Sequence, residues 1–180
     1  PLPGNVSAYR IDGSTGALAE IIGSPFAAGS QPSSVVVDPS GKFAYVANQN
    51  QNGSPLPGNV SAYRIDGSTG ALTEITGSPF AAGSQPRSVT VDPSGKFAYV
   101  ANTTSNNVSA YLIDVATGAL IPVPGSPFAL GTGSNPSSVV VDPSGKFAYV
   151  VRGSFNVSAF AINGSTGALA AITGSPFAAG

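Results

Sequence analysis

The string Asp-Pro-Ser-Gly-Lys-Phe-Ala-Tyr-Val, residues 38–46, decides the fold of this chain. It recurs unchanged at Asp92–Val100 and at Asp142–Val150. Asp suits position i of a type I turn, Pro suits position i+1 and Gly suits position i+3, so the first four residues predict a tight turn. The apolar run that follows shows no alternation, which is typical of a strand covered on both faces. Each copy therefore predicts a turn that leads into a buried β-strand.

Two further strings recur in the same order along the chain. Asn-Val-Ser-Ala followed by an aromatic residue begins at four positions: Asn5, Asn59, Asn107 and Asn156. Gly-Ser-Pro-Phe-Ala also begins at four positions: Gly23, Gly77, Gly125 and Gly174. The copies of the first string lie 48 to 54 residues apart, a period typical of the four short strands and turns in one blade of a β-propeller. The sequence therefore predicts an all-β chain of four-stranded antiparallel blades.

Turn residues divide each repeat into four expected strands. Examples of the first to the fourth strand are Ser34–Val37, Phe43–Asn48, Val108–Asp114 and Ala19–Ile22. We interpret the Gly-Ser-Pro-Phe strings as links between blades. The division predicts a half blade over 1–28 and whole blades over 29–82, 83–130 and 131–180, about three and a half blades in one repeat array.

The half blade begins inside a repeat, because Pro-Leu-Pro-Gly at 1–4 returns at 55–58. It has only a third and a fourth strand, so we expect the inner edge of its third strand to be unpaired. Unpaired strand edges readily pair with other strands. The expected partner is therefore a second copy of this chain, or further repeats of a longer chain, through edge pairing.

Charge and hydropathy argue against two classes of partner. The chain has 7 basic and 8 acidic residues and a net charge of -1, whereas nucleic-acid binding needs a basic face that neutralises phosphates. A polybasic membrane-surface segment is absent for the same reason. No apolar run is long enough to cross a bilayer. We expect neither nucleic-acid binding nor membrane insertion.

The chain contains no Cys, Met, Trp or His. A protein without oxidisable sulfur tolerates oxidising surroundings well, so we expect an extracellular or cell-surface location. The sequence has no nucleophile–base pair, zinc spacing, phosphate loop or dinucleotide fingerprint. We therefore expect no cofactor and no metal site, and we assign no catalytic residue.

Positions at which the repeats differ are the candidates for contact with a ligand or partner, because the scaffold makes the same demands in every blade. Arg87 stands where the other repeats have Ser, and Arg152 stands where they have Asn. A guanidinium group binds carboxylate or phosphate through two parallel hydrogen bonds. The alternative is ordinary variation of exposed residues.

Four recurrent Asn residues lie in the Asn-x-Ser pattern of glycosylation: Asn5, Asn59, Asn107 and Asn156. In a secreted protein they are candidate glycan sites. Asn and Ser are also favoured in tight turns, which is the alternative explanation. For the Asp of each Asp-Pro-Ser-Gly turn we favour capping of its own turn over binding of Ca²⁺, because each turn has a single carboxylate.

The linked strings resemble the YVTN repeat of the lactonase-like seven-bladed propellers, which include 6-phosphogluconolactonase-type proteins. The resemblance rests on Asp-Pro-Ser-Gly-Lys, on Phe-Ala-Tyr-Val-Ala-Asn, and on Asn-Val-Ser-Ala-Tyr with its following Thr-Gly-Ala-Leu. The strings are also similar to repeats of microbial surface-layer and secreted propellers. The resemblance covers the whole chain and implies the propeller fold.

The resemblance carries over no catalytic residue. It implies chemistry by His, Arg and Glu side chains at the propeller mouth, whereas this chain has no His and its two Glu, Glu20 and Glu74, fall in the fourth strand. Near-identical blades are also unlike an enzyme site, to which different blades contribute different groups. We therefore expect a non-enzymatic structural or interaction protein that assembles through exposed blade edges. The alternatives are a segment of a lactonase-like hydrolase whose catalytic residues lie outside this chain, and a propeller that binds a sugar or peptide at its mouth.

Overall fold

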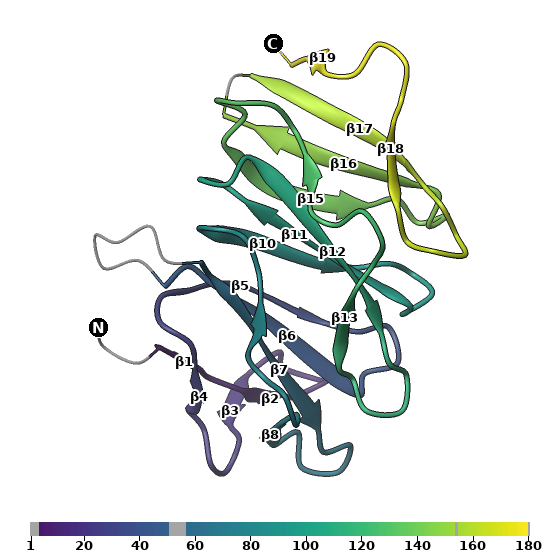
Figure 1. Ribbon diagram of the computed structural model, residues 1–180. Helices are drawn as coiled ribbons and strands as arrows, with labels where there is room; N and C mark the ends of the chain where they lie inside the picture. Colours follow the sequence, from purple (N-terminus) through teal and green to yellow (C-terminus); the bar gives the residue numbers. More distant parts are fainter. Residues whose placement is uncertain (1–3, 51–56, 154, 180) are drawn as a thin grey trace.

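The computed structural model describes residues 4–50, 57–153 and 155–179, and every regular element in them is a β-strand (Figure 1). The described residues contain no helix that could span a membrane. The predicted all-β class is confirmed.

Three five-stranded antiparallel sheets follow one another along the chain, and we name them blades A, B and C. Blade A contains β5 (Pro32–Val37), β6 (Phe43–Asn48), β7 (Asn59–Ile65), β8 (Leu72–Glu74) and β9 (Phe80–Ala81). Blade B contains β10 (Pro86–Val91), β11 (Phe97–Asn102), β12 (Asn107–Ile113), β13 (Leu120–Pro122) and β14 (Phe128–Ala129). Blade C contains β15 (Pro136–Val141), β16 (Phe147–Arg152), β17 (Asn156–Ile162), β18 (Leu169–Ala171) and β19 (Phe177–Ala178). In each blade the first four strands lie side by side in chain order, as the repeats predict.

The short fifth strand of each blade corrects one expectation. The Gly-Ser-Pro-Phe segments do not simply link blades, because Phe80 pairs with Val60 in the third strand of its own blade. The chain thus turns back onto its own blade after the fourth strand. The Ser78 hydroxyl stabilises this turn by accepting a hydrogen bond from the Ala62 N–H at 3.0 Å. Sequence patterning missed these strands because two apolar residues show no period.

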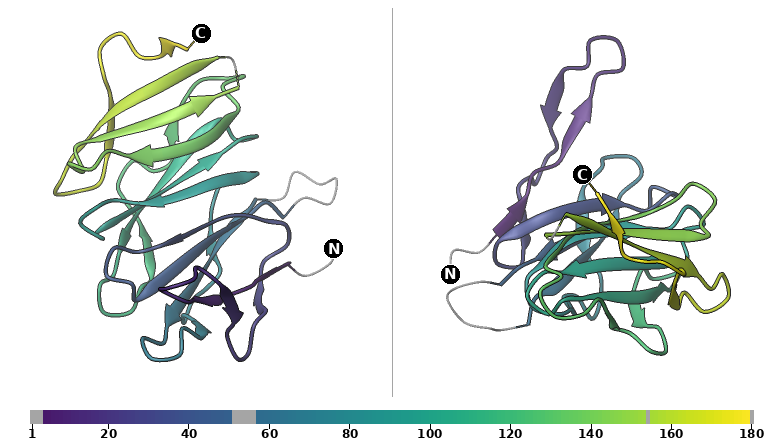
Figure 2. Two further views of the ribbon diagram at one scale, coloured as in Figure 1. Left: turned by 180° about the vertical axis from the view of Figure 1, so that it is seen from behind. Right: turned by 90° about the horizontal axis from the view of Figure 1, so that it is seen from above.

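Residues 4–28 form two small sheets that we call the half-blade. Its strands are β1 (Gly4–Val6), β2 (Tyr9–Ile11), β3 (Leu18–Glu20) and β4 (Phe26–Ala28). β1 pairs with β4 and β2 pairs with β3, so the third strand, continuous in blades A to C, is interrupted here. The half-blade and blade C lie at opposite ends of the stack (Figure 1), and the half-blade extends from one side of it (Figure 2).

The core of the protein lies between neighbouring blades. One buried cluster joins β6 and β7 of blade A to blade B, and a second joins β11 and β12 of blade B to blade C. The Tyr45 hydroxyl donates to the Gly118 carbonyl at 3.0 Å, and the Tyr99 hydroxyl donates to the Gly167 carbonyl at the same distance. The apolar character of β6 and β11 on both faces follows from this packing, since all six residues of each strand are buried.

The Asp-Pro-Ser-Gly turns confirm the expected capping. A carboxylate oxygen of Asp38 accepts hydrogen bonds from the N–H groups of Lys42 at 2.8 Å and Phe43 at 2.7 Å. Asp92 and Asp142 make the same two bonds in blades B and C. Each Asp therefore satisfies backbone donors that start the following strand.

Candidate functional site

The two ends of the blades differ in composition, and all candidate residues fall at one of them. We call it the mouth end: the first strands begin there, the second strands end there and the third strands begin there. The register places Pro86 opposite Asn102, and Asn102 opposite Asn107. In blade C, Pro136 lies opposite Arg152, and Arg152 opposite Asn156. The antiparallel topology thus brings the sequence-predicted residues to the same end of neighbouring sheets.

Arg87 occupies a β-bulge at the start of β10. The register shifts between Pro86 and Ser88, so Arg87 is the extra residue, and its side chain is exposed. A bulge leaves its extra residue outside the ladder and often re-aims a side chain beside a functional site. The first strand therefore starts two residues before its predicted beginning. The same bulge occurs at Ser33 in blade A and at Ser137 in blade C, so only the side chain at this position differs between the blades.

The equivalent residue in blade A ties two blades together. The Ser33 hydroxyl donates to the Pro86 carbonyl of blade B at 2.9 Å. In blade B the Thr103 hydroxyl makes the matching bond to the Pro136 carbonyl of blade C at 2.7 Å. Thr103 therefore supplies at the junction of blades B and C the bond that Ser33 supplies at the junction of blades A and B.

Arg152 replaces a residue that is fully buried in the other two blades. The Asn48 amide donates to Asn59 Oδ1 at 2.8 Å and to Ser61 Oγ at 2.9 Å, and Asn102 makes the same pair of bonds. Arg152 is half-buried, and its Nε is buried without a hydrogen-bond partner among the described residues. The substitution removes the amide network of the other blades and places a cation at the mouth end.

Two of the four recurrent Asn residues make hydrogen bonds that show a role in the scaffold. Asn59 and Asn107 are half-buried and accept the hydrogen bonds of the buried amides. This role accounts for their recurrence without a glycan. Asn5 is exposed and Asn156 is half-buried, and glycosylation stays a prediction for all four sites.

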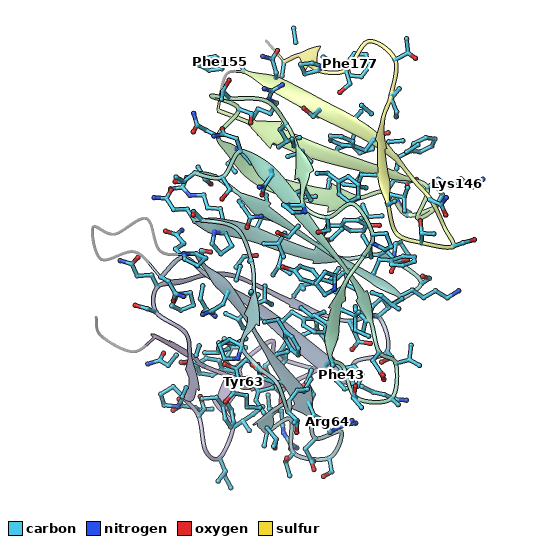
Figure 3. All side chains as sticks on the ribbon, viewed as in Figure 1. Phe43, Tyr63, Arg64, Lys146, Phe155 and Phe177 are labelled. Atoms are coloured by element: carbon cyan, nitrogen blue, oxygen red, sulfur yellow. The ribbon has the colours of Figure 1, made fainter. Side chains whose placement is uncertain are left out.

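Backbone strain is also concentrated at the mouth end. Non-glycine residues with positive φ in the described chain are Gln31, Asn50, Gln85, Asn106, Asn135 and Phe155. All of them precede a first strand or follow a second strand. Asn adopts this conformation readily, whereas it is a true outlier for a bulky residue. Phe155, whose side chain lies at the outer edge of blade C in Figure 3, is therefore the most strained of them. Such strain gathers at functional sites.

The carboxylates of the chain lie away from the mouth end. Three cap the Asp-Pro-Ser-Gly turns and three more lie in the turns after the third strands, at the opposite end of the blades. Glu20 and Glu74 end the short fourth strands. Hydrogen bonds from Ser and Thr hydroxyl and backbone groups hold the pKa of Asp12 and Asp66 well below its ordinary value. Asp12 and Asp66 are therefore weak proton acceptors at neutral pH. Among the described residues the charge at the mouth end is positive, from Arg87 and Arg152.

Two equivalent grooves lie beside the short outer strands β3 and β8, which form the outer rim. The groove beside Arg10 and Glu20 has a volume of about 390 Å³, and the groove beside Arg64 and Glu74 has a volume of about 450 Å³. The guanidinium of Arg64 donates to the Ala116 carbonyl at 2.8 Å and lies 5.0 Å from the centre of the Phe43 ring (Figure 3). Sequence reasoning missed this cation–π contact. Arg64 therefore joins blades A and B at the rim.

Comparison with known proteins identifies the family. A family model described as lactonase, seven-bladed β-propeller, matches residues 2–133. The chain belongs to the seven-bladed lactonase family. The predicted resemblance is therefore confirmed.

Individual relatives of this lactonase-family chain cover it to different extents. A protein of Formosa agariphila named 6-phosphogluconolactonase is 39% identical over 70 residues, which is 39% of this chain and 18% of that protein. A solved structure from Bacteroides fragilis, of a protein proposed to be a 6-phosphogluconolactonase, has a TM-score of 0.72 at 23% identity and covers 95% of this chain and 48% of that one. A Lactobacillus plantarum structure has a TM-score of 0.71 at 20% identity, with 94% and 48% coverage. The chain thus spans about half the length of these solved structures, which share its fold.

The family membership and the named relatives overturn one expectation. The interpretation as a non-enzymatic structural protein is wrong, and the findings favour the lactonase-like hydrolase. The error came from reading the uniformity of the repeats as a property of the whole molecule. Uniform strings such as residues 38–46 lie in strands and turns that every blade needs, and they carry no information about the mouth end.

Proposed function

We propose that this chain forms part of a lactonase-type hydrolase that opens the ring of an anionic sugar lactone. Membership of the lactonase family carries the proposal. The name 6-phosphogluconolactonase of the Formosa agariphila relative supports a phosphorylated substrate. The positive mouth end, with Arg87 and Arg152 and with the carboxylates elsewhere, supports an anionic one.

Lactone hydrolysis divides the work between two kinds of group. A base must take a proton from water as it attacks the ring carbonyl, and cationic or N–H donors must stabilise the oxyanion that develops. Guanidinium groups suit the second task and the binding of a phosphate or carboxylate. The chain has no His, and its Asp carboxylates are tied into turns. We assign binding of the anionic group to this chain, and the general base to residues outside it.

The test uses the complete protein as its gene encodes it. Acid release from 6-phosphogluconolactone and from unphosphorylated gluconolactone is followed at constant pH, with spontaneous hydrolysis subtracted. We expect catalysed hydrolysis with a lower KM for the phosphorylated lactone. Absence of hydrolysis of both lactones above the uncatalysed rate would refute the proposal.

The matched variant is Arg87→Ser, which restores the residue of blades A and C. We expect KM for the phosphorylated lactone to rise about tenfold, because one charge-assisted contact is lost. KM for the unphosphorylated lactone and the urea midpoint should not change. An equal rise of KM for both lactones would show that Arg87 does not bind the phosphate.

A further inference from the structure

The turn that follows each third strand differs in blade C at its first residue. These turns end in Thr-Gly, and we call them the Thr-Gly turns: residues 12–16, 66–70, 114–118 and 163–167. The first residue is Asp in the other three turns and Asn163 in blade C. The second residue of this turn is Gly164, whereas blade B has Val115 at the same position. Among the four turns, Asn followed by Gly therefore occurs only in blade C.

The turn holds the Asn163 side chain by its oxygen. Asn163 Oδ1 accepts hydrogen bonds from the N–H groups of Ser165 at 3.0 Å and Thr166 at 3.1 Å. Neither Asn163 Nδ2 nor the Gly164 N–H donates a hydrogen bond to the part of the chain that the structure describes. Both residues are exposed, and a Cβ added to Gly164 would meet no atom within 4 Å. The side-chain amide of Asn163 and the main-chain amide of Gly164 are thus both open to solvent.

The space beside Gly164 is wide and lined by cations. Gly164 lines a cavity of about 410 Å³ at the junction of blades B and C, together with Lys96 and Lys146, the latter labelled in Figure 3. The equivalent cavity at the junction of blades A and B is lined by Val115 and has a volume of about 140 Å³. The Asp92 carboxylate also lines the larger cavity, but hydrogen bonds tie it into its own turn. Ammonium groups favour negative charge that develops on neighbouring atoms, so these surroundings favour loss of a proton from an amide.

We propose that Asn163 deamidates spontaneously in the folded protein, with the nitrogen of Gly164 as the nucleophile. The Gly164 N–H gives its proton to solvent base, and its nitrogen forms a bond to Asn163 Cγ. The Cγ–Nδ2 bond then breaks, and Nδ2 takes up a proton from water and leaves as ammonia. A second water opens the cyclic imide at either of its carbonyls and gives aspartate or isoaspartate at position 163. The net reaction adds water and releases ammonia, so it needs no oxidant or reductant.

The two products differ in their effect on the turn. Aspartate is the residue of the other three Thr-Gly turns, and Asp66 Oδ1 accepts the same two backbone hydrogen bonds as Asn163 Oδ1. Isoaspartate instead diverts the main chain through Cβ and Cγ, so the carbonyl that accepts from the Gly167 N–H at 2.7 Å becomes a free carboxylate. Gly167 packs on blade B, since a Cβ added to it would lie 2.4 Å from Phe97. Aspartate therefore keeps the turn, and isoaspartate disturbs the contact between blades B and C.

The test follows tryptic peptides of the complete protein during incubation in mildly alkaline buffer. We expect the peptide that begins at Gly153 and contains Asn163 to gain the mass difference between OH and NH₂, and to become a substrate for an isoaspartyl methyltransferase. The other Asn-Gly pair of the sequence, Asn52–Gly53, lies outside the described residues and falls in the separate peptide 43–64. Asn135 is the internal control, because the Pro that follows it has no N–H to attack, and it should stay unchanged.

The matched variant is Gly164→Val, which introduces the residue of blade B at a position with open space around the added Cβ. We expect deamidation of Asn163 to slow about tenfold, because a β-branched side chain hinders closure of the imide, while the urea midpoint stays unchanged. Equal rates in the two proteins would contradict attack by Gly164.

Incubation of the protein in urea shows whether the folded turn permits the reaction. Conversion of Asn163 in the unfolded protein but not in the folded one would contradict the proposal, as would conversion without isoaspartate. The proposal goes beyond the proposed function and does not depend on it. Because the peptides are measured without substrate, its failure is distinct from failure of the lactonase proposal.

Discussion

The two ends of the blades are made by the same repeats, but only one of them is uniform: the end opposite the mouth end, which carries the Asp-Pro-Ser-Gly turns and which we call the turn end. Asp38, Asp92 and Asp142 cap identical turns with the same hydrogen bonds. At the mouth end, Arg87 and Arg152 replace the Ser and Asn of the other blades. A residue that is identical in every blade is therefore one that the fold requires. A residue that differs between blades occupies a position at which the fold does not require one particular side chain. Substitutions at the two ends and at the packing between blades test this difference.

The largest effect is expected at the Thr-Gly turn of blade B. Gly118→Ala places a Cβ 2.5 Å from the Phe43 ring at a residue with φ of 79°. We expect a loss of about 4 kcal/mol in the free energy of unfolding, from overpacking and backbone strain together. Gly16→Ala is the matched control with φ of 72° and open space around the added Cβ. Urea unfolding should show a loss of only about 1 kcal/mol there, and equal losses would contradict the inter-blade packing.

A swap between blades tests the mouth end. Asn102→Arg should destabilise the chain by about 3 kcal/mol, because Gly83 packs against the buried amide and leaves no room for a longer side chain. The reverse change, Arg152→Asn, should leave the urea midpoint equal or higher, since it removes a guanidinium whose Nε is buried without a described partner. In the complete protein the same change should raise KM for the phosphorylated lactone. Tolerance of Asn102→Arg would show that the mouth end is as permissive in blade B as in blade C.

Removal of one turn cap tests the uniform end. Asp92 is buried and accepts bonds from the N–H groups of Ser94, Lys96 and Phe97. Asp92→Ala should cost about 2 kcal/mol in urea unfolding, because the buried Phe97 N–H loses its partner. Asp142→Ala removes the same bonds at an exposed turn, where water replaces them, and should cost clearly less. A larger loss for Asp142→Ala would contradict the role of burial.

The smallest effect concerns acid stability. The pKa of Asp66 is lowered by hydrogen bonds from Ser68 and Thr69, so this carboxylate stabilises the fold above its unfolded pKa and loses that contribution as the pH falls below about 5. Asn163 occupies the equivalent position in blade C and accepts backbone bonds from Ser165 and Thr166. Asp66→Asn should therefore keep the turn and reduce the slope of unfolding free energy against pH between about 5 and 2. An unchanged slope in acid titration would contradict the pKa shift.

Most of the fold could be predicted from the sequence because its determinants are local and repeated. The Asp-Pro-Ser-Gly turn, the apolar run of residues 43–48 and the period of the Asn-Val-Ser-Ala strings together define the blades. The short fifth strands and the bulge at Arg87 could not be predicted, since both depend on which strand lies alongside. The interruption of the third strand between β1 and β2 also has no counterpart in the repeated string.

The candidate site was predictable only in part. Comparison of the repeats singled out Arg87 and Arg152, and the topology places both at the mouth end. The amide network of Asn48 and Asn59 was missed, because the two residues belong to different strings and meet only across the register of β6 and β7. The proposed hydrolase class could not be inferred from uniform blades, since the strings that repeat serve packing and the chain lacks the His that the family resemblance implies.

The bond from the Thr103 hydroxyl to Pro136 has a consequence for how such arrays diversify. When a repeat is duplicated, each copy has the same residues and makes the same structural contacts. A substitution in either copy then loses one of those contacts. Here a loop residue, Thr103, makes at one junction the bond that a strand residue, Ser33, makes at the other, so both junctions keep the bond although position 87 is not Ser. Transfer of a hydrogen bond between adjacent elements is thus a route by which identical modules acquire individual chemistry.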